Sequence, residues 1–141
     1  MLGKIEWLTE YSSAELETVR AVEKIFCIQF PDDYLNIALD FQGGEPSSKI
    51  IVVNEIIINF GFLLTFLAFD ELDILDKYNS ERYNLPWRHF PFAIDEKDNM
   101  FCFDYSGGDV PVIVFVQKVK DNIVRSSFIA QSFSALLQML Q

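Results

Sequence analysis

Hydrophobic positions in the first third of the chain follow a helical period. Apolar residues recur at steps of three or four along residues 16–26, which is the spacing of one helix face. Ser12 and Glu15, just before them, have the spacing of a capping box. A second apolar stretch follows Pro31, which suits the first turn of a helix, and ends at a glycine pair at positions 43 and 44. The pattern predicts two N-terminal helices.

The stretch from residue 50 to residue 69 is almost continuously apolar and is about as long as a membrane span. Glu55 would be costly at membrane depth, however, and Gly61 divides the run into short pieces rich in β-branched and aromatic residues. We therefore expect strands here and no membrane contact. The expected strands are residues 50–53, 55–60 and 63–69. An exposed edge in this region would promote dimers, so a monomer and a homodimer both stay open.

The second half of the chain alternates strands with short polar turns. Asp70 is expected to cap a short acidic helix that runs to residue 78, and residues 79–89 read as a loop. Short turns at 95–99 and 106–109 indicate antiparallel pairing. The expected strands are 90–94, 100–105, 112–116 and 123–130, followed by a helix from residue 132. The fold class predicted is α+β: a single, mainly antiparallel sheet covered by N-terminal and C-terminal helices, in one domain over residues 1–141.

The net charge of the chain indicates which class of partner it can bind. The 141 residues carry 21 acidic and 11 basic side chains, for a net charge of −10. Such a field repels a phosphate backbone, so we expect no direct nucleic-acid contact. It attracts a basic protein. Cys27 and Cys102 each sit in an apolar stretch, as reduced buried cysteines do, and the first residues do not resemble a secretory signal. We therefore expect a cytoplasmic protein.

Candidate chemistry is sparse. His89 is the only histidine, and the prolines and aromatic residues around it indicate packing at the junction between a loop and a strand. Neither glycine pair has the spacing of a phosphate-binding loop, and two distant cysteines with one histidine give no zinc signature. We expect no metal, no cofactor and no enzyme activity. A hydrolase that uses two of the many carboxylates stays open as an alternative.

Three segments together resemble the SUKH superfamily, which includes the yeast cell-wall-assembly regulator domain and many bacterial immunity proteins. They are EKIFCIQFPDDYLNIALDFQGG (23–44), FPFAIDEKDNMFCFDYSGGDVPVIVFV (90–116) and IAQSFSALLQML (129–140). The turn at 95–99 departs from the pattern because it lacks a glycine. The resemblance implies a non-enzymatic immunity protein that binds and neutralises a cognate toxin, commonly a nuclease. The alternative it implies is a general interaction or regulatory scaffold.

Acidic residues concentrate in two places that we expect to form the partner surface. One cluster lies within the segment that carries the second resemblance, and the other lies on the predicted acidic helix, where residues three apart would form a stripe. Two aromatic side chains are candidate anchors, because binding hot spots favour such residues. The alternatives are a solvated face for the acids and core packing for the aromatic rings. The nominated residues are Asp95, Glu96, Asp98, Asp104, Asp109, Asp70, Asp73, Asp76, Tyr105 and Trp87.

Overall fold

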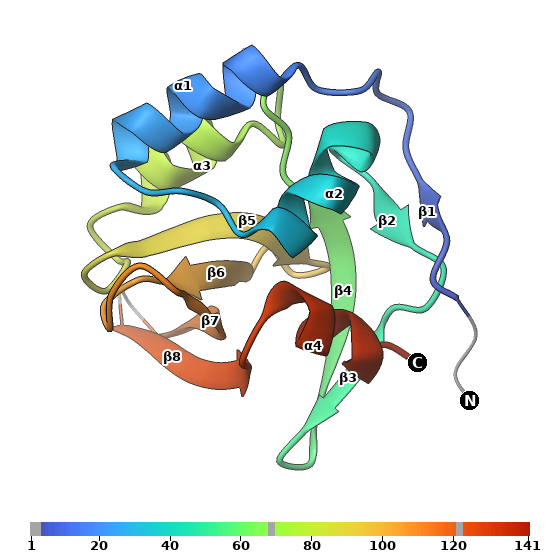
Figure 1. The fold of residues 1–141 in the computed structure, drawn as a ribbon. Helices are drawn as coiled ribbons and strands as arrows, with labels where there is room; N and C mark the ends of the chain where they lie inside the picture. Colours follow the sequence, from blue (N-terminus) through green and yellow to red (C-terminus); the bar gives the residue numbers. More distant parts are fainter. Residues whose placement is uncertain (1–3, 68–69, 121–122) are drawn as a thin grey trace.

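The computed structural model describes residues 4–67, 70–120 and 123–141 (Figure 1). Its helices are α1 (Leu16–Phe26), α2 (Asp32–Phe41), α3 (Ile74–Glu81) and α4 (Phe133–Met139). Its strands are β1 (Trp7–Leu8), β2 (Glu45–Pro46), β3 (Ile50–Val53), β4 (Ile56–Leu63), β5 (His89–Asp95), β6 (Met100–Asp104), β7 (Val112–Lys120) and β8 (Ile123–Ala130).

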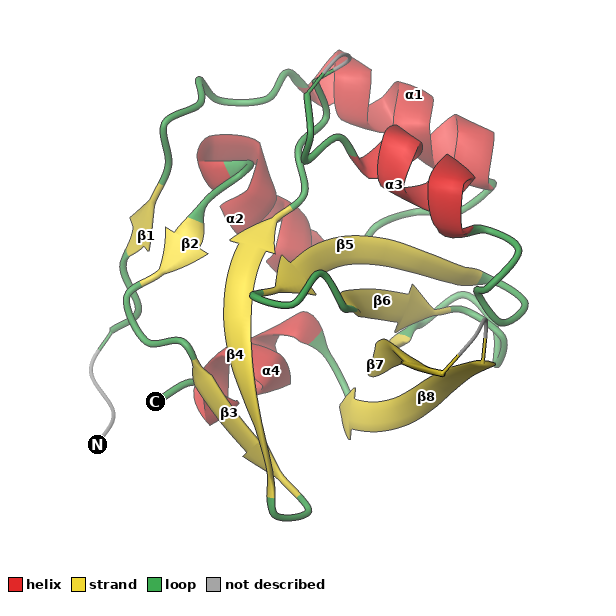
Figure 2. Ribbon diagram, turned by 180° about the vertical axis from the view of Figure 1, so that it is seen from behind, coloured by secondary structure: helices red, strands yellow, loops and turns green. Residues whose placement is uncertain are grey.

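Six of the strands form one antiparallel sheet. They lie in the order β3-β4-β5-β6-β7-β8, so every neighbour in the sheet is also a neighbour along the chain. β1 and β2 form a separate antiparallel pair. The predicted α+β class and the antiparallel sheet are confirmed. Figure 2 shows β4 crossing in front of α2 and α4, and the β3–β4 hairpin extending away from the other strands.

The core lies between the sheet and the helices and is rich in aromatic rings. Buried residues of α1, α2 and α4 belong to the same apolar cluster as buried residues of β3 to β8. Phe92 and Phe103 stack with their ring centres 4.2 Å apart, and Tyr34 of α2 meets Phe103 edge-on at 5.0 Å. Burying a large side chain of this kind contributes roughly 1.5–3 kcal/mol, so these rings supply much of the stability.

The other face of the sheet holds a second, smaller core. Met100, Cys102, Val114 and Val116 are buried there, and Leu85 from the loop after α3 packs against them. Side chains alternate along β6: Phe101 and Phe103 face the first core while Cys102 faces the second. The sheet also curls. Ser126 Oγ of β8 lies 3.5 Å from His89 Nε2 of β5, although β6 and β7 lie between these strands.

The predicted strand break at Gly61 is wrong. β4 runs through Gly61, where the register with β5 shifts. A Cβ at Gly61 would lie 2.8 Å from the Ile94 carbonyl oxygen, so glycine permits a bulge rather than a break. The expected strand at 63–69 is also wrong beyond Leu63 for the residues described; positions 68 and 69 lie outside them. Glu55 belongs to a turn, in which Asn54 and Glu55 both have positive φ.

The predicted helix starts need correction. α1 begins after Glu15, and no side chain caps it, so Ser12 and Glu15 form no capping box. Pro31 is the N-cap of α2 rather than a residue of its first turn. Asp73, not Asp70, caps α3, and this helix continues to Glu81 into the expected loop. Cys102 is buried as predicted, but Cys27 is exposed, because it ends α1 in a left-handed conformation with φ of 58°.

Candidate functional site: an apolar groove with an acidic rim

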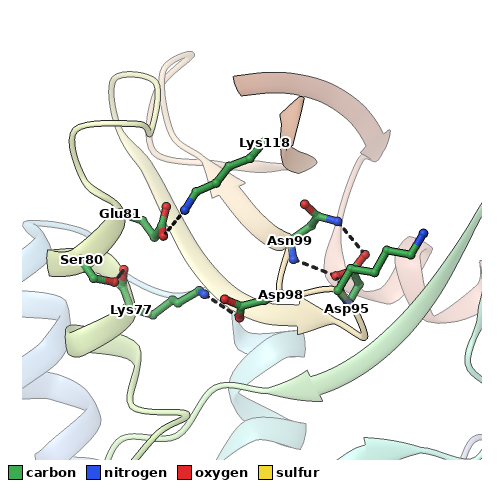
Figure 3. Close-up of polar contacts among 8 residues, drawn as sticks. Lys77, Ser80, Glu81, Asp95, Asp98, Asn99 and Lys118 are labelled. Atoms are coloured by element: carbon green, nitrogen blue, oxygen red, sulfur yellow. Dashed lines mark hydrogen bonds and ion pairs between the residues drawn. The ribbon is translucent and has the colours of Figure 1, made fainter. Parts of the chain in front are cut away.

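Asp95 holds the shape of the β5–β6 turn. Its Oδ1 accepts hydrogen bonds from the backbone N–H groups of Lys97 and Asn99 at 2.9 and 2.8 Å. Its Oδ2 accepts a third from Asn99 Nδ2 at 3.1 Å (Figure 3). The side chain is buried. The turn forms without glycine because Asp98 takes the left-handed conformation, with φ of 65°, and these bonds stabilise it. They leave Asp95 little surface to offer a partner.

Beside this turn, two ion pairs link α3 to the sheet (Figure 3). Asp98 Oδ1 lies 2.6 Å from Lys77 Nζ, and Glu81 Oε1 lies 2.7 Å from Lys118 Nζ. Asp98 is itself largely exposed, so this pair adds little to stability. The Lys77 ammonium partly neutralises the negative charge of Asp98. Glu96 is exposed, and its Oε1 accepts a hydrogen bond from Asn59 Nδ2 at 3.1 Å.

The five acids nominated in the 95–109 segment do not form one patch. β6 separates Asp98 from Asp104 and Asp109, and its five residues span about 17 Å at about 3.4 Å per residue. Asp104 is half-buried, and its Oδ1 accepts a hydrogen bond from Ser106 N–H at 2.8 Å. Asp109 is exposed and lines a different groove, with Cys27 and Arg88.

The predicted acidic stripe on α3 does not exist as one helix face. Asp70 precedes the helix, and its Oδ1 accepts a hydrogen bond from Leu72 N–H at 2.7 Å. Asp73 is the buried N-cap, and burial raises the pKa of its carboxyl group. Asp76 is exposed in the first turn of α3.

The two nominated aromatic residues have opposite environments. The Tyr105 ring is buried in the core, and its hydroxyl donates a hydrogen bond to the Gln29 carbonyl oxygen at 2.5 Å. Trp87 is 72% exposed, and the Arg88 guanidinium lies 5.9 Å from its ring centre. Tyr105 therefore packs in the core, and Trp87 is the one of the two that a partner can reach.

A groove of about 700 Å³ brings together acids that are far apart in the sequence. Its apolar lining comes from β1, β4, β5 and the loop before α3, and its acidic lining comes from β2 and two loops. The apolar residues are Leu8, Phe62, Leu72 and Ile94. The acidic residues are Glu10, Glu45, Asp70 and Glu71. We refer to this site as the acidic groove.

Pairing between elements shapes the acidic groove. Leu8 of β1 is paired with Glu45 of β2, which sets these two residues side by side. The bulge at Gly61 turns Phe62 to the face of β4 opposite the main core. Gly43, with φ of 68°, lies against the Tyr11 ring, where a Cβ would clash. Tyr11 also lines the groove, and burial together with the neighbouring Asp70 carboxylate raises the pKa of its phenol.

The charge of the acidic groove is uncompensated over most of its rim. No Lys, Arg or His lies among the described residues that line it. Lys49 reaches Glu45 from outside, with Nζ 3.1 Å from Oε1. Within the described ranges, no basic side chain is ion-paired with Glu10, Asp70 or Glu71. Of the nominated acids only Asp70 lies here. Glu71 follows it in the sequence, whereas Glu10 and Glu45 come from segments that only the tertiary structure brings close.

A family model described as the SMI1 / KNR4 family (SUKH-1) matches residues 13–139. The chain belongs to this family. No curated protein and no solved structure gives a match.

Several residues of the SUKH-like segments brace the fold from within. Glu23 Oε2 accepts a hydrogen bond from Phe30 N–H at 2.6 Å. Asp33 Oδ2 accepts hydrogen bonds from both the backbone and the hydroxyl of Ser134, at 2.8 and 2.9 Å, which ties α2 to α4. Ser132 caps α4 through a bond from Ala135 N–H at 3.1 Å. These contacts account for architecture, and they do not specify a partner.

His89 sits at the junction of a loop and β5, as predicted. Its Nδ1 lies 2.9 Å from the Trp87 carbonyl oxygen and 3.7 Å from Asp104 Oδ1. Ser126 and Asp104 flank it, but neither they nor His89 line the acidic groove or the groove beside Asp109.

In the part of the chain that the structure describes, no three His, Cys, Asp or Glu side chains gather as a metal site. No helix of the described residues is long and apolar enough to cross a membrane.

Proposed function

We propose that this SUKH-1 chain is an immunity-type protein that neutralises a cognate bacterial toxin by direct contact through its acidic surface. Family membership supports a role in protein binding, and the net charge of −10 favours a basic partner. A nuclease is the class of toxin that this charge suits best, because a nuclease holds its substrate with basic residues. The protein would act in the cytoplasm of the cell that it protects.

The observation that carries this proposal is the composition of the acidic groove. Interfaces combine an apolar centre, which supplies affinity when it is buried, with a polar rim, which supplies specificity and steering. The groove has Phe62 and Leu72 in its lining and three acids on its rim with no described basic partner. The groove also gathers four carboxylates, so a hydrolase that uses two of them stays open as an alternative, although His89 lies outside the groove.

The proposal refines the nominated surface. Asp70 becomes its centre, and Glu10, Glu45 and Glu71 join it. Exposed acids elsewhere contribute long-range steering, and Trp87 is a candidate anchor at a second contact. The outlying acids are Glu96, Asp98, Asp109 and Asp76. Asp73, Asp95 and Tyr105 are buried, so they act through the fold, and Asp104 is half-buried.

Co-expression tests the proposal. A toxin domain, sought among the genes next to the one for this chain, would be induced in a bacterial host with this chain, with an unrelated acidic protein of similar size, or alone. The expected result is growth only with this chain, together with a one-to-one complex on size exclusion. Loss of growth in all three cultures would reject the immunity function. Recovery of several host proteins and no toxin from the same cells would favour the regulatory scaffold instead.

A further inference from the structure

Apolar side chains gather on the outer face of the β3–β4 hairpin. Ile50 and Val52 of β3 are 41% and 47% exposed, and Ile57 and Phe62 of β4 are 65% and 38% exposed. The hairpin extends beyond the other strands (Figure 2). Single exposed apolar residues are ordinary, but a contiguous set marks an interaction site. We call these four residues the apolar stripe.

Strand alternation explains why the apolar stripe is on one side. Ile51 and Ile58 are register partners and are buried in the main core, so their neighbours in the chain point the other way. Val52 and Ile57 are register partners on that outer side. Simple alternation would put Phe62 on the side opposite to Ile57. The bulge at Gly61 adds one residue to β4, so Phe62 lies on the same side as Ile57.

The apolar stripe and the acidic groove are continuous, because Phe62 belongs to both. Leu8, which is 72% exposed, extends the apolar area at the groove end. Acids border this area at several points: Glu10, Asp70 and Glu71 lie at the groove, Glu55 lies at the hairpin turn, and Glu96 lies beside Asn59. Two exposed lysines also border the stripe: Lys49 precedes Ile50, and Lys97 lines a pocket with Ile57. The acidic rim is therefore concentrated at the groove end of the apolar area.

We propose that the apolar stripe and the acidic groove form one docking surface for a segment of the partner protein in which Lys or Arg alternates with apolar residues. The proposal rests on the proposed function, and it names the part of the partner that is recognised. Apolar side chains of that segment cover Phe62 and Ile57, while its cations meet Asp70 and Glu71. Charge complementarity decides the occupant, since the groove lining has four acids and no described base.

A second copy of the chain fits this surface poorly. Two copies docked through it would bring like-charged rims together, which is unfavourable. The open edge of β3 is also short, because Ile50 exchanges both of its backbone hydrogen bonds with Gln141, at 3.0 and 2.9 Å. A dimer formed by pairing β3 with its copy would therefore gain few hydrogen bonds.

Two synthetic peptides test the surface directly. One alternates lysine with leucine over seven residues, and its control alternates glutamate with leucine. Amide chemical shifts of the wild-type chain are followed while each peptide is added. The expected changes lie at residues 8–10, 56–62 and 70–72, and they occur with the lysine peptide only. Changes centred on the groove beside Asp109, or spread evenly over the acidic surface, would overturn the proposal.

Matched variants separate the surface from net charge. The triple variant Glu10→Gln, Asp70→Asn, Glu71→Gln removes three rim charges, and the asparagine keeps an acceptor for Leu72 N–H. The control is Glu17→Gln, Asp32→Asn, Asp40→Asn, which removes three exposed acids elsewhere. Phe62→Thr is matched by Phe128→Thr, since both are exposed strand residues. The groove variants should weaken lysine-peptide binding at least about tenfold, and the controls less than about twofold.

The same variants distinguish failure of this inference from failure of the proposed function. If the toxin domain binds the wild type, the three-charge groove variant should lose at least about tenfold in affinity relative to its control. Equal loss in both variants would overturn the docking surface and leave the immunity function standing. If the toxin domain does not bind the wild type, the immunity function fails, and the peptide shifts alone decide the surface. Circular dichroism confirms that each variant is folded.

Discussion

Glu23 Oε2 accepts the backbone N–H of Phe30 at 2.6 Å, inside the protein and seven residues along the chain. This bond ties the end of α1 to the segment that leads into α2. The other oxygen of Glu23 meets Arg20 at 2.6 Å on the surface side, where Arg20 is half-exposed. The glutamate of the first SUKH-like segment is thus a brace between two helices.

Removing this brace should destabilise the chain. Glu23→Ala leaves a buried N–H without a partner, which costs about 1–3 kcal/mol. Arg20→Ala removes only an exposed partner, and the expected loss is below about 1 kcal/mol. Urea denaturation of both variants measures the difference. Equal losses would show that the ion pair, rather than the bond to Phe30, is what stabilises this region.

Two buried tyrosines provide a matched pair of tests. The Tyr105 hydroxyl donates to Gln29, whereas the Tyr34 hydroxyl has no hydrogen-bond partner among the described residues. Tyr105→Phe should lower the free energy of unfolding by about 1 kcal/mol, because it removes a made hydrogen bond. Tyr34→Phe should be neutral or stabilising, since it removes a buried hydroxyl that gains nothing. A larger loss for Tyr34→Phe in thermal denaturation would contradict this account.

Asp73 should make stability depend on pH. Burial raises its pKa in the folded protein above the usual 3.8, so the native state binds a proton more readily than the unfolded state. Its contribution to stability therefore falls as pH rises through the interval between the two pKa values and stays unfavourable above it. Asp73→Asn keeps the capping oxygen that Leu75 N–H requires and removes the charge.

We expect Asp73→Asn to be at least as stable as the wild type at pH 7, with the advantage shrinking as pH falls below the raised pKa. Asp73→Ala is the control, because it also removes the charge but loses the cap, at a cost of about 1 kcal/mol. Denaturation curves from pH 3 to pH 7 measure both. An advantage of the asparagine variant that grows towards acid pH would reverse the predicted sign.

Gly61 should not tolerate a side chain. A Cβ there would lie 2.8 Å from the Ile94 carbonyl oxygen, within the backbone of the paired strand. Gly61→Ala should therefore destabilise by about 1–3 kcal/mol, as overpacking does. Gly107→Ala is the control, since no atom lies within 4 Å of its added Cβ. Similar denaturation midpoints for the two variants would show that β4 can shift without loss.

The strand region after residue 89 was predictable because its signals are local. Polar turns at 95–99 and 106–109 separate alternating or continuous apolar runs, and the observed strands β5 to β8 follow them.

Helix starts were less predictable, because several neighbouring side chains are able to cap the same helix. Asp70 and Asp73 both suit a cap, and the bond from Ile74 N–H to the Thr65 carbonyl oxygen at 2.8 Å, a contact outside the helix, favours Asp73.

The acidic groove could not be predicted for the same reason. Leu8, Glu45, Phe62 and Asp70 come from four separate segments, which tertiary contacts such as the β1–β2 pairing and the bulge at Gly61 bring together. The sequence indicated the sign of the charge and placed Asp70 in an acidic segment. It did not show that Asp95 holds a turn, because a carboxylate that holds a turn and one that faces a partner are the same residue type.

The most direct test of the central claim is the rate of association between this chain and the purified toxin domain encoded beside it, measured by stopped-flow fluorescence at increasing salt. An acidic surface that steers a basic partner predicts fast association at low salt, with a rate constant that falls as screening increases from about 0.01 M to about 0.5 M salt. The dissociation rate should change less, since the buried apolar centre governs it. No association at low salt would contradict the claim of binding, and a salt-independent association rate would contradict the role of the acidic surface.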